Sequence, residues 1–403
     1  MIINFKCKNF YSVGDEEAVV NFAVDGNAPK THLYQDVRDA GIRTSLIEAV
    51  IGPNASGKTT LLKVPAFLQH LIVTSLNDPI GRPLSYEPHK NYSHKPTEVS
   101  VKFSMQDQLF EYEFILSKQR ILSERFIEYS KTEERFTAKT LFSREWDSKT
   151  KKYTLKDTVF NMSEDQLREN ASMVAVAKQL PGNIFAHKIA MYWWTDVVSY
   201  NLWMRGHRES AIMDGGIIFT EIDLLLENPS LRRGVTDILK RYDIGFDEFV
   251  REEIKTLGDP IFMYGLKHAY NKASFSVPLG DESTGTKRLI AILTHIIRAM
   301  SIKHDGVAVI DELDAFLHPD IVEALVDLFV DEDTNVNKAQ LLFSTHNHRV
   351  LTFLDKQQIT LSEKNDKGES EVWRLDDVQG VRAGDNYYTK YTAGAYSAKP
   401  RIG

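Results

Sequence analysis

The chain has 403 residues, enough for two or three average domains or for one large domain with insertions. Its hydrophobic fraction of 42% and charged fraction of 26% are typical of a folded globular protein and exclude a disordered or collagen-like chain. The formal net charge of −7 argues against a generally basic nucleic-acid-binding protein, although a local basic patch is compatible with it.

The single cysteine, Cys7, excludes an internal disulfide and a cysteine metal cluster, so a reducing cytoplasm is the expected location. The first residues lack the cationic lead and the long apolar core of a signal peptide. No apolar run approaches the ~18 residues needed to span a bilayer. We therefore expect a cytoplasmic protein with no membrane partner.

Residues 1–96 begin with two strands, because apolar and polar side chains alternate over residues 2–24. A short apolar run at 46–51 leads into a glycine-rich turn, and the spacing over 58–70 predicts a helix. The order of strand, loop and helix makes this segment the first part of an α/β domain.

Residues 97–160 predict an antiparallel β lobe, since aromatic and β-branched runs between 98 and about 142 are separated by polar pairs. The segment 118–156 has eleven Lys and Arg against six Asp and Glu, a local charge of +5. A solvated face of the sheet and a docking surface both fit this charge, and a solvated face is the commoner of the two.

Residues 161–270 predict a helical lobe, because helical spacing begins after Ser163, which acidic residues follow in the first turn. A cluster of aromatic residues in this lobe is either a core between helices or an exposed stacking surface for bases or a partner. A core is favoured, since large aromatic side chains dominate buried area. The cluster comprises Tyr192, Trp193, Trp194, Tyr200 and Trp203.

Residues 271–403 return to α/β character, with a loop at 280–286, a helix over 287–300 and a buried strand at 307–310. A helix from Asp320 and a strand at 341–345 follow. We expect the two ends of the sequence to build one sheet, with the β lobe and the helical lobe inserted between them.

The eight residues from 52 to 59 match the pattern G-x-x-x-x-G-K-[ST] of a phosphate-binding P-loop, between an apolar strand and a helix. Backbone N–H groups and the helix N-terminus would surround the phosphates of ATP, Lys58 would reach the β- and γ-phosphate oxygens, and Thr59 would supply a hydroxyl to Mg²⁺. The predicted ATP contacts are Gly52, Pro53, Asn54, Ala55, Ser56, Gly57, Lys58, Thr59 and Thr60.

A nucleotide site of this kind needs a second acid at a neighbouring strand end, and the strand 307–310 ends in Asp311 and Glu312. Asp311, with Thr59, is the predicted Mg²⁺ site, and Glu312 is the predicted group that orients or deprotonates the attacking water. A surface carboxylate is the alternative for Glu312, because a P-loop protein can bind ATP without hydrolysing it.

Further motifs resemble those of ABC and SMC-like ATPases. Residues 311–314 (D-E-L-D) resemble the Walker B motif and the D-loop, in which Asp314 would help couple two protomers. Residues 282–289 resemble the ABC signature, with Ser283 and Gly285 at the Ser and second Gly positions of L-S-G-G-Q and departures elsewhere. The resemblance implies that this signature reaches the γ-phosphate from a second subunit.

Two more residues complete the set that such ATPases use. His346, one strand after Asp311, resembles the H-switch, where a neutral imidazole bonds the γ-phosphate. These ATPases also have a Gln, at the join of two lobes, that contacts Mg²⁺ and the attacking water. Gln179 is the best candidate for it, and a surface position explains this residue nearly as well.

The chain as a whole resembles the bacterial AAA15 family of compact ABC/SMC-like ATPases, which includes ATPases of abortive-infection and other phage-defence systems. The resemblance extends from K-N-F-Y-S near the N-terminus through these motifs to the closing segment 391–400. It implies an α/β P-loop ATPase head of the ABC/SMC type with an antiparallel β lobe and an inserted helical lobe. It also implies a head-to-tail ATP-driven dimer that works with a separately encoded effector and answers a phage trigger, protein or nucleic acid.

Two nuclease architectures fit less well. OLD-type nucleases, which have related ATPase domains, have a Toprim domain after the H-switch, and we expect none here, since 57 residues without an acidic metal cluster follow His346. HEPN-type ribonucleases use an Arg and a His about five residues apart, a spacing that Arg298 and His304 have. That pair lies at a predicted helix C-terminus, where the helix dipole favours cations, and we prefer this interpretation.

The leading hypothesis is a defence ATPase that senses infection and controls a toxic effector through its ATP state. The main alternative is an SMC-class DNA maintenance or repair ATPase, but such proteins have a long coiled coil and no sustained heptad run occurs here. A nucleotide-binding scaffold without turnover is a third alternative. The segments 191–208 and 118–156 are the expected docking surfaces, because exposed aromatics with Arg are typical interface anchors.

Overall fold

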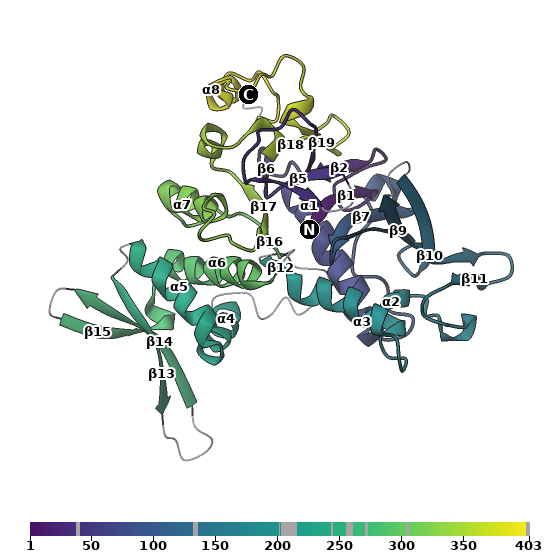
Figure 1. Ribbon diagram of the computed structural model, residues 1–403, viewed down its shortest axis with the longest axis horizontal. Coiled ribbons are helices and arrows are strands. Elements are labelled where there is room, and N and C mark those ends of the chain that lie inside the picture. Colours follow the sequence, from purple (N-terminus) through teal and green to yellow (C-terminus); the bar gives the residue numbers. More distant parts are fainter. Residues whose placement is uncertain are drawn as a thin grey trace.

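The computed structural model describes residues 1–37, 41–131, 136–200, 202, 216–242, 245–254, 261–270, 273–303 and 306–399. At its centre lies a six-stranded sheet with the order β12-β16-β17-β6-β18-β19, with helices to one side and a larger sheet to the other (Figure 1). The strands are β12 (Val197–Tyr200), β16 (Val307–Ile310), β17 (Gln340–Thr345), β6 (Ile47–Ile51), β18 (Ile359–Lys364) and β19 (Ser370–Arg374).

The strands of the central sheet come from both ends of the sequence, which confirms that prediction. β6 pairs in parallel with β17 on one side and with β18 on the other, and β16 pairs in parallel with β17 and β12. β19 is antiparallel to β18 at the edge. All residues of β6 and β16 are buried, as is typical of parallel strands that are covered on both faces.

Alternate side chains of the central strands enter two different cores, as the period of two residues requires. Val50 and Val309 pack in one core with helix α1 and the β lobe. Ile51 and Ile310 pack in the other core with helices α6 and α7. The helices are α1 (Lys58–Gln69), α6 (Thr284–Ser301) and α7 (Pro319–Val330).

The predicted antiparallel meander is confirmed, because β7 to β11 are successive neighbours in a sheet of order β11-β10-β9-β8-β7-β1-β2. β1 and β2 belong to the same sheet, so strands from the first residues extend the lobe that was expected to begin at residue 97. The strands are β1 (Ile2–Lys8), β2 (Ala18–Asn21), β7 (Thr97–Met105), β8 (Gln108–Leu116), β9 (Ile121–Lys131), β10 (Phe136–Asp147) and β11 (Lys152–Asp157).

The segment 161–270, predicted as a helical lobe, contains strands as well as helices. β12 joins the edge of the central sheet, a place that its Val-Val-Ser-Tyr sequence suits. A separate antiparallel sheet of order β13-β14-β15 follows the helices. The helical prediction is wrong for β12, which is short and pairs with a strand more than a hundred residues later, and for β13 and β14. β15 lies beyond the segment that was predicted as helical. The elements are α2 (Met173–Ala177), α3 (Ile184–Met191), α4 (Gly216–Glu227), α5 (Pro229–Arg241), β13 (Phe246–Ile254), β14 (Ile261–Tyr270) and β15 (Ala273–Pro278).

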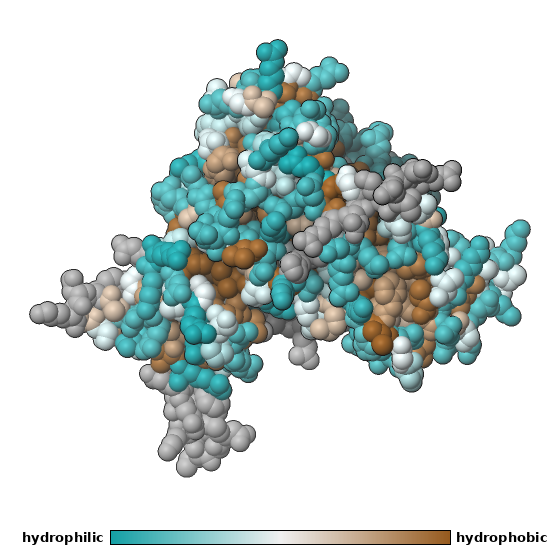
Figure 2. Space-filling view, in the orientation of Figure 1, coloured by the Kyte–Doolittle hydropathy of each residue, from teal (hydrophilic) through white to brown (hydrophobic). Residues whose placement is uncertain are grey.

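Smaller elements complete the described chain. A three-stranded sheet of order β3-β5-β4 precedes β6, and helix α8 lies at the top of Figure 1. Figure 2 shows that this upper part of the molecule is mainly hydrophilic, whereas apolar surface gathers in the lower half. Among the helices that the structure describes, none is both long and apolar enough to cross a membrane. The elements are β3 (Ala23–Val24), β4 (Tyr34–Val37), β5 (Ile42–Ser45) and α8 (Tyr387–Thr392).

A carboxylic acid lies inside the central sheet. Glu48 of β6 is fully buried, and its Oε1 accepts a hydrogen bond of 2.6 Å from Thr360 Oγ1. Its Oε2 has no hydrogen-bond partner among the described residues. Burial raises the pKa of Glu48 to about 8, although the Thr360 hydroxyl and the charge of Arg374 act in the opposite direction. Glu48 is therefore protonated in the folded protein at neutral pH.

We expect the stability of the protein to fall between pH ~5 and ~8 more steeply than that of Glu48→Gln. In this range the folded protein retains a proton that the unfolded chain releases, so each pH unit lowers the free energy of unfolding by up to ~1.4 kcal/mol. Gln keeps an acceptor for Thr360 but has no such proton. Thermal unfolding of both proteins across this range measures the difference, and parallel pH profiles would contradict the buried acid.

Candidate active site

The predicted P-loop lies between β6 and α1, at the carboxyl end of a central strand. Gly57 has a φ of 115° and Ala55 a φ of 61°, so the loop passes through the left-handed region. A Cβ at Gly57 would lie 2.1 Å from Ser370 Oγ, and a Cβ at Gly52 would lie 2.1 Å from the carbonyl oxygen of Ser362. Because β18 and β19 approach so closely, both positions require glycine.

Lys58 lies within the curve of the loop. Its buried side chain donates hydrogen bonds to the carbonyl oxygens of Gly52 at 2.9 Å and Pro53 at 3.0 Å. Burial lowers the pKa of Lys58, and the carboxylate of Asp311 is the strongest of the acids that act in the opposite direction. A cation in this position can contact a phosphate that the loop binds.

Asp311 is held at the end of β16 by two hydroxyl groups. Thr59 Oγ1 donates to Asp311 Oδ2 at 2.8 Å, and Ser344 Oγ donates to Asp311 Oδ1 at 2.5 Å. The same Ser344 oxygen accepts a hydrogen bond of 2.7 Å from the backbone N–H of Glu312. Helix α1 and strands β16 and β17 meet in this hydrogen-bond chain, because the carboxyl ends of parallel strands share one edge of the sheet.

The Thr59 hydroxyl and the Asp311 carboxylate fit a Mg²⁺ ion of a nucleotide site. Mg²⁺ prefers oxygen ligands, and in P-loop proteins it takes one hydroxyl and one acid from the chain together with phosphate oxygens. The two protein oxygens are 2.8 Å apart. Such a site differs from a metal cluster of three or more His, Cys, Asp or Glu, of which none occurs in the part of the chain that the structure describes.

Glu312 follows Asp311 with a φ of 52°, which is rare for a residue with a side chain. Arg288 of α6 holds this turn, since its Nη2 donates to the carbonyl oxygens of Asp311 at 3.1 Å and Glu312 at 2.5 Å. Strained backbone of this kind clusters at active sites. The backbone of Glu312 is therefore fixed beside the Asp311 carboxylate.

The structure brings Asp314 and His346 together. The backbone N–H of His346 donates to both carboxylate oxygens of Asp314, at 3.1 and 3.2 Å. His346 also lines a cavity of about 550 Å³ whose walls include the first part of the P-loop. The cavity is lined by Gly52, Pro53, Asn54, Ser56, His346, His348, Glu363, Lys364 and Lys399.

The predicted signature residues lie at the exposed start of α6. Ser283 is the N-cap, and its Oγ accepts a hydrogen bond of 3.0 Å from the backbone N–H of Thr286. A Cβ at Gly285 would lie 2.8 Å from the carbonyl oxygen of Phe316, which follows the D-loop and is 74% exposed. No hydrogen bond between described residues joins Ser283 or Gly285 to the P-loop of the same chain.

Gln179 does not lie at the P-loop, which corrects the prediction. It is exposed just beyond α2, and its neighbour Lys178 donates to the carbonyl oxygen of Val73. Val73 belongs to a π-helical turn, His70–Thr74, that continues α1. At ~1.5 Å per residue, this turn is about 20 Å along the helix from Lys58.

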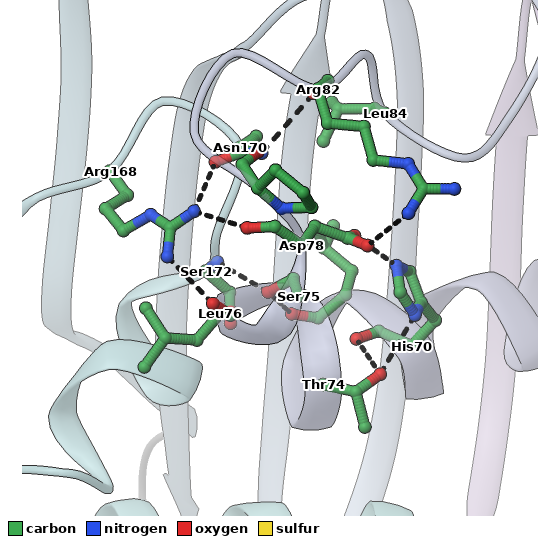
Figure 3. A network of polar contacts seen from close by, with 12 residues as sticks. His70, Thr74, Ser75, Leu76, Asp78, Arg82, Leu84, Arg168, Asn170 and Ser172 are labelled. Atoms are coloured by element: carbon green, nitrogen blue, oxygen red, sulfur yellow. Dashed lines mark hydrogen bonds and ion pairs between the residues drawn. The ribbon is translucent and has the colours of Figure 1, made fainter. Parts of the chain in front are cut away.

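A polar network fixes this arrangement (Figure 3). Arg168 donates to the carbonyl oxygen of Asp78 at 2.5 Å, and the N–H of Ser172 donates to Ser75 Oγ at 3.1 Å. His70 pairs with Asp78 at 2.9 Å. The segment that leads into α2 is thus tied to the far end of α1. The sequence does not show which end of α1 packs against the lobe that contains α2. It therefore does not determine where Gln179 lies.

The sequence-based assignment missed residues that border the loop. Ser12 Oγ forms hydrogen bonds of 2.8 Å with Thr60 Oγ1 and with Ser370 Oγ, so K-N-F-Y-S contacts the start of α1. Lys364 and Lys399 line the cavity beside His346. The sequence could have indicated Ser12 and Lys399, because they lie in K-N-F-Y-S and in the segment 391–400, the first and last segments on which the family resemblance rests.

Most of the aromatic cluster is buried in the core, which is the alternative that the sequence favours. Tyr192, Trp193 and Tyr200 are buried, whereas Trp194 is 54% exposed and Met191, just before the cluster, is 55% exposed. Trp203 lies outside the described residues. Part of the segment 191–208 can therefore still offer an apolar surface.

Two further hypotheses from the sequence are less favoured, namely the basic docking surface at 118–156 and the nuclease pair of Arg298 and His304. Basic residues of the segment 118–156 pair with glutamates, which fits a solvated face of the sheet better than a docking surface. The pairing cations at the surface are Lys118, Arg120 and Arg125, whereas Arg144 and its partner Glu124 are buried. Arg298 lies in the last turn of α6, as the helix-dipole interpretation requires, and His304 lies outside the described residues.

A family model and a solved structure are similar to this chain. The model of the family described as "AAA domain, putative AbiEii toxin, Type IV TA system" matches residues 47–352. A solved structure described as "Crystal structure of the SmcHead bound to the C-winged helix domain of ScpA" is similar at 15% identity and a TM-score of 0.46, covering 93% of this chain and 98% of that chain. No curated protein matches the chain.

Proposed function

Because the chain belongs to the family described as "AAA domain, putative AbiEii toxin, Type IV TA system", we propose that it is a Mg²⁺-dependent ATPase of the ABC/SMC type. The observation behind this proposal is the hydrogen-bond chain through Thr59, Asp311 and Ser344, next to the P-loop lysine. A hydroxyl, a carboxylate and a cation close together beside a P-loop support a role in ATP hydrolysis. The finer assignment to the AAA15 family stays a prediction.

Each residue has a distinct part in the proposed reaction. The loop N–H groups and Lys58 bind the phosphates, and Thr59 and Asp311 hold Mg²⁺, which supplies positive charge to the phosphate oxygens when bound. Glu312 accepts the proton of the attacking water. His346 hydrogen-bonds the terminal phosphate, and its backbone bond to Asp314 links the site to the turn after β16.

The proposed active form is a head-to-tail dimer in which Ser283 and Gly285 of one copy reach the ATP that the other copy binds. Ser283 is exposed at a helix N-terminus, a place that suits a phosphate. The exposed ring of Phe316 beside Gly285 suits burial in a contact between subunits.

We further propose that the ATP state of this dimer controls a separately encoded toxic effector in a phage-defence system. Met191, the last residue of α3, and Trp194, in the π-helical turn that follows, are the proposed contacts for that partner, since exposed large apolar side chains are typical interface anchors. The defence role, the effector and the phage trigger are proposals that the ATPase assignment does not require.

Pull-down of the protein expressed from its native operon should recover a neighbour-encoded protein, and Trp194→Asp should lower that recovery. Phe275→Asp, at a similarly exposed ring on β15, is the matched control. The purified protein should leave DNA and RNA intact with ATP and Mg²⁺ or Mn²⁺. Nuclease activity that survived purification and Glu312→Gln would overturn the proposal of a separate effector and return attention to Arg298 and His304.

A further inference from the structure

The segment after α8 has an unusual backbone that the proposed function leaves without a purpose. Ser397 has a φ of 58° and Ala398 a φ of 55°, so two successive residues with side chains adopt the left-handed conformation. This conformation is unfavourable for such residues and persists only where surrounding contacts hold it. The contacts that hold this segment therefore indicate which residue the strained backbone positions.

Both sides of the Ala398 backbone are anchored. Its N–H donates to Glu363 Oε2 at 2.8 Å, and its carbonyl oxygen accepts a hydrogen bond of 2.6 Å from the hydroxyl of Tyr391. Tyr391 is buried, and its ring centroid lies 4.8 Å from that of His348. These contacts fix the next residue, Lys399, in the wall of the cavity beside the P-loop.

Lys364 and Lys399 bring positive charge to that cavity, which the acid Glu363 also lines. Lys399 donates to the carbonyl oxygen of Thr392, and Lys364 donates to that of Gly368 at 2.9 Å. Among the described residues, neither forms an ion pair, whereas Lys390 of α8 pairs with Asp385 at 2.6 Å.

The pKa of the neighbouring His348 imidazole reflects the positive charges beside the cavity. Burial lowers the pKa of His348, and the charges of His346, Lys399 and Lys58 lower it further, against the effect of Asp314. Lys399 and Lys58 therefore both act on one point beside the loop. A polyanion there would be stabilised by both lysines.

We propose that Lys399, assisted by Lys364, binds the terminal phosphate of ATP, so that the segment 391–399 distinguishes ATP from ADP. This inference rests on the proposed ATP binding. The loop residues that line the cavity are Gly52, Pro53, Asn54 and Ser56, and His346 lines it too, whereas Thr59 and Thr60 at the start of α1 do not. A phosphate in it is therefore the one farthest from the helix, which is the terminal phosphate.

Calorimetric titration of the full chain with Mg²⁺ and either ADP or a non-hydrolysable ATP analogue tests the proposal. Lys399→Ala should weaken binding of the analogue about tenfold or more and binding of ADP less than about twofold. Lys399→Arg should retain most of the preference for the analogue. Lys390→Ala, on α8 just before this segment and paired with Asp385, is the matched control and should bind both nucleotides normally.

Each other outcome has a definite meaning. Equal losses for both nucleotides in Lys399→Ala, or no loss for either, would overturn the assignment to the terminal phosphate. If Lys399→Ala unfolds, Lys364→Ala provides the same comparison with the anchored segment intact. Wild-type protein that binds neither nucleotide would instead refute the proposed ATPase, and Lys58→Ala shows the loss expected when the loop itself is disabled.

Discussion

Glu312→Gln should lower the rate of ATP hydrolysis by about 10²- to 10³-fold while ATP remains bound. Gln has nearly the same shape but cannot accept the proton of the attacking water. The backbone bonds that fix residue 312, from its N–H to Ser344 and from Arg288 to its carbonyl oxygen, do not depend on the side chain. Release of phosphate and retention of labelled ATP measure the two effects separately.

Lys58→Ala should abolish both hydrolysis and tight binding, because it removes the cation that the loop holds at the phosphates. Glu98→Gln, an exposed acid on β7, is the control for a general effect of lost charge.

Turnover at the wild-type rate in Glu312→Gln would mean that another group accepts the proton, and the site would need a different base.

Mixing Ser283→Arg with Lys58→Ala should restore activity that neither variant has alone. In a head-to-tail dimer, the heterodimer has one site with an intact P-loop from one copy and an intact signature from the other. In an equal mixture about half of the dimers are mixed, so at most about a quarter of the wild-type activity returns. Steady-state ATPase assays of the mixture over a range of ratios measure this rescue.

Ser301→Arg, at the other end of α6, is the matched control and should leave dimerisation intact. Light scattering with ATP should show dimers for the control and monomers for Ser283→Arg alone. If Ser283→Arg hydrolyses ATP as a monomer, or if the mixture gives only the mean of two independent activities, the composite site is wrong.

The central part of the site could be predicted because its signals are local. A β-branched strand that ends in two acids, and a glycine-rich loop between strand and helix, contain both the geometry and the chemistry in a few successive residues. Parallel pairing then places Asp311 beside Thr59 without further information.

The parts that could not be predicted depend on distant contacts. β12 has only four residues, and its place in the sheet comes from pairing with β16. The position of Gln179 depends on the hydrogen bond from Arg168 to Asp78, in the segment that follows α1, which no periodicity in the sequence reveals. Lys399 reaches the loop through two left-handed residues held by Glu363 and Tyr391, a conformation that its sequence does not favour.

The arrangement of the central sheet has a consequence for the order of folding during synthesis. β6, which leads into the P-loop, pairs with β17 and β18, which follow it by about 300 residues. At about 5–20 residues per second, a ribosome needs roughly 15 to 60 seconds to make the intervening chain. The loop glycines contact residues of β18 and β19, and therefore a nascent chain cannot assemble the ATP site until those strands have emerged.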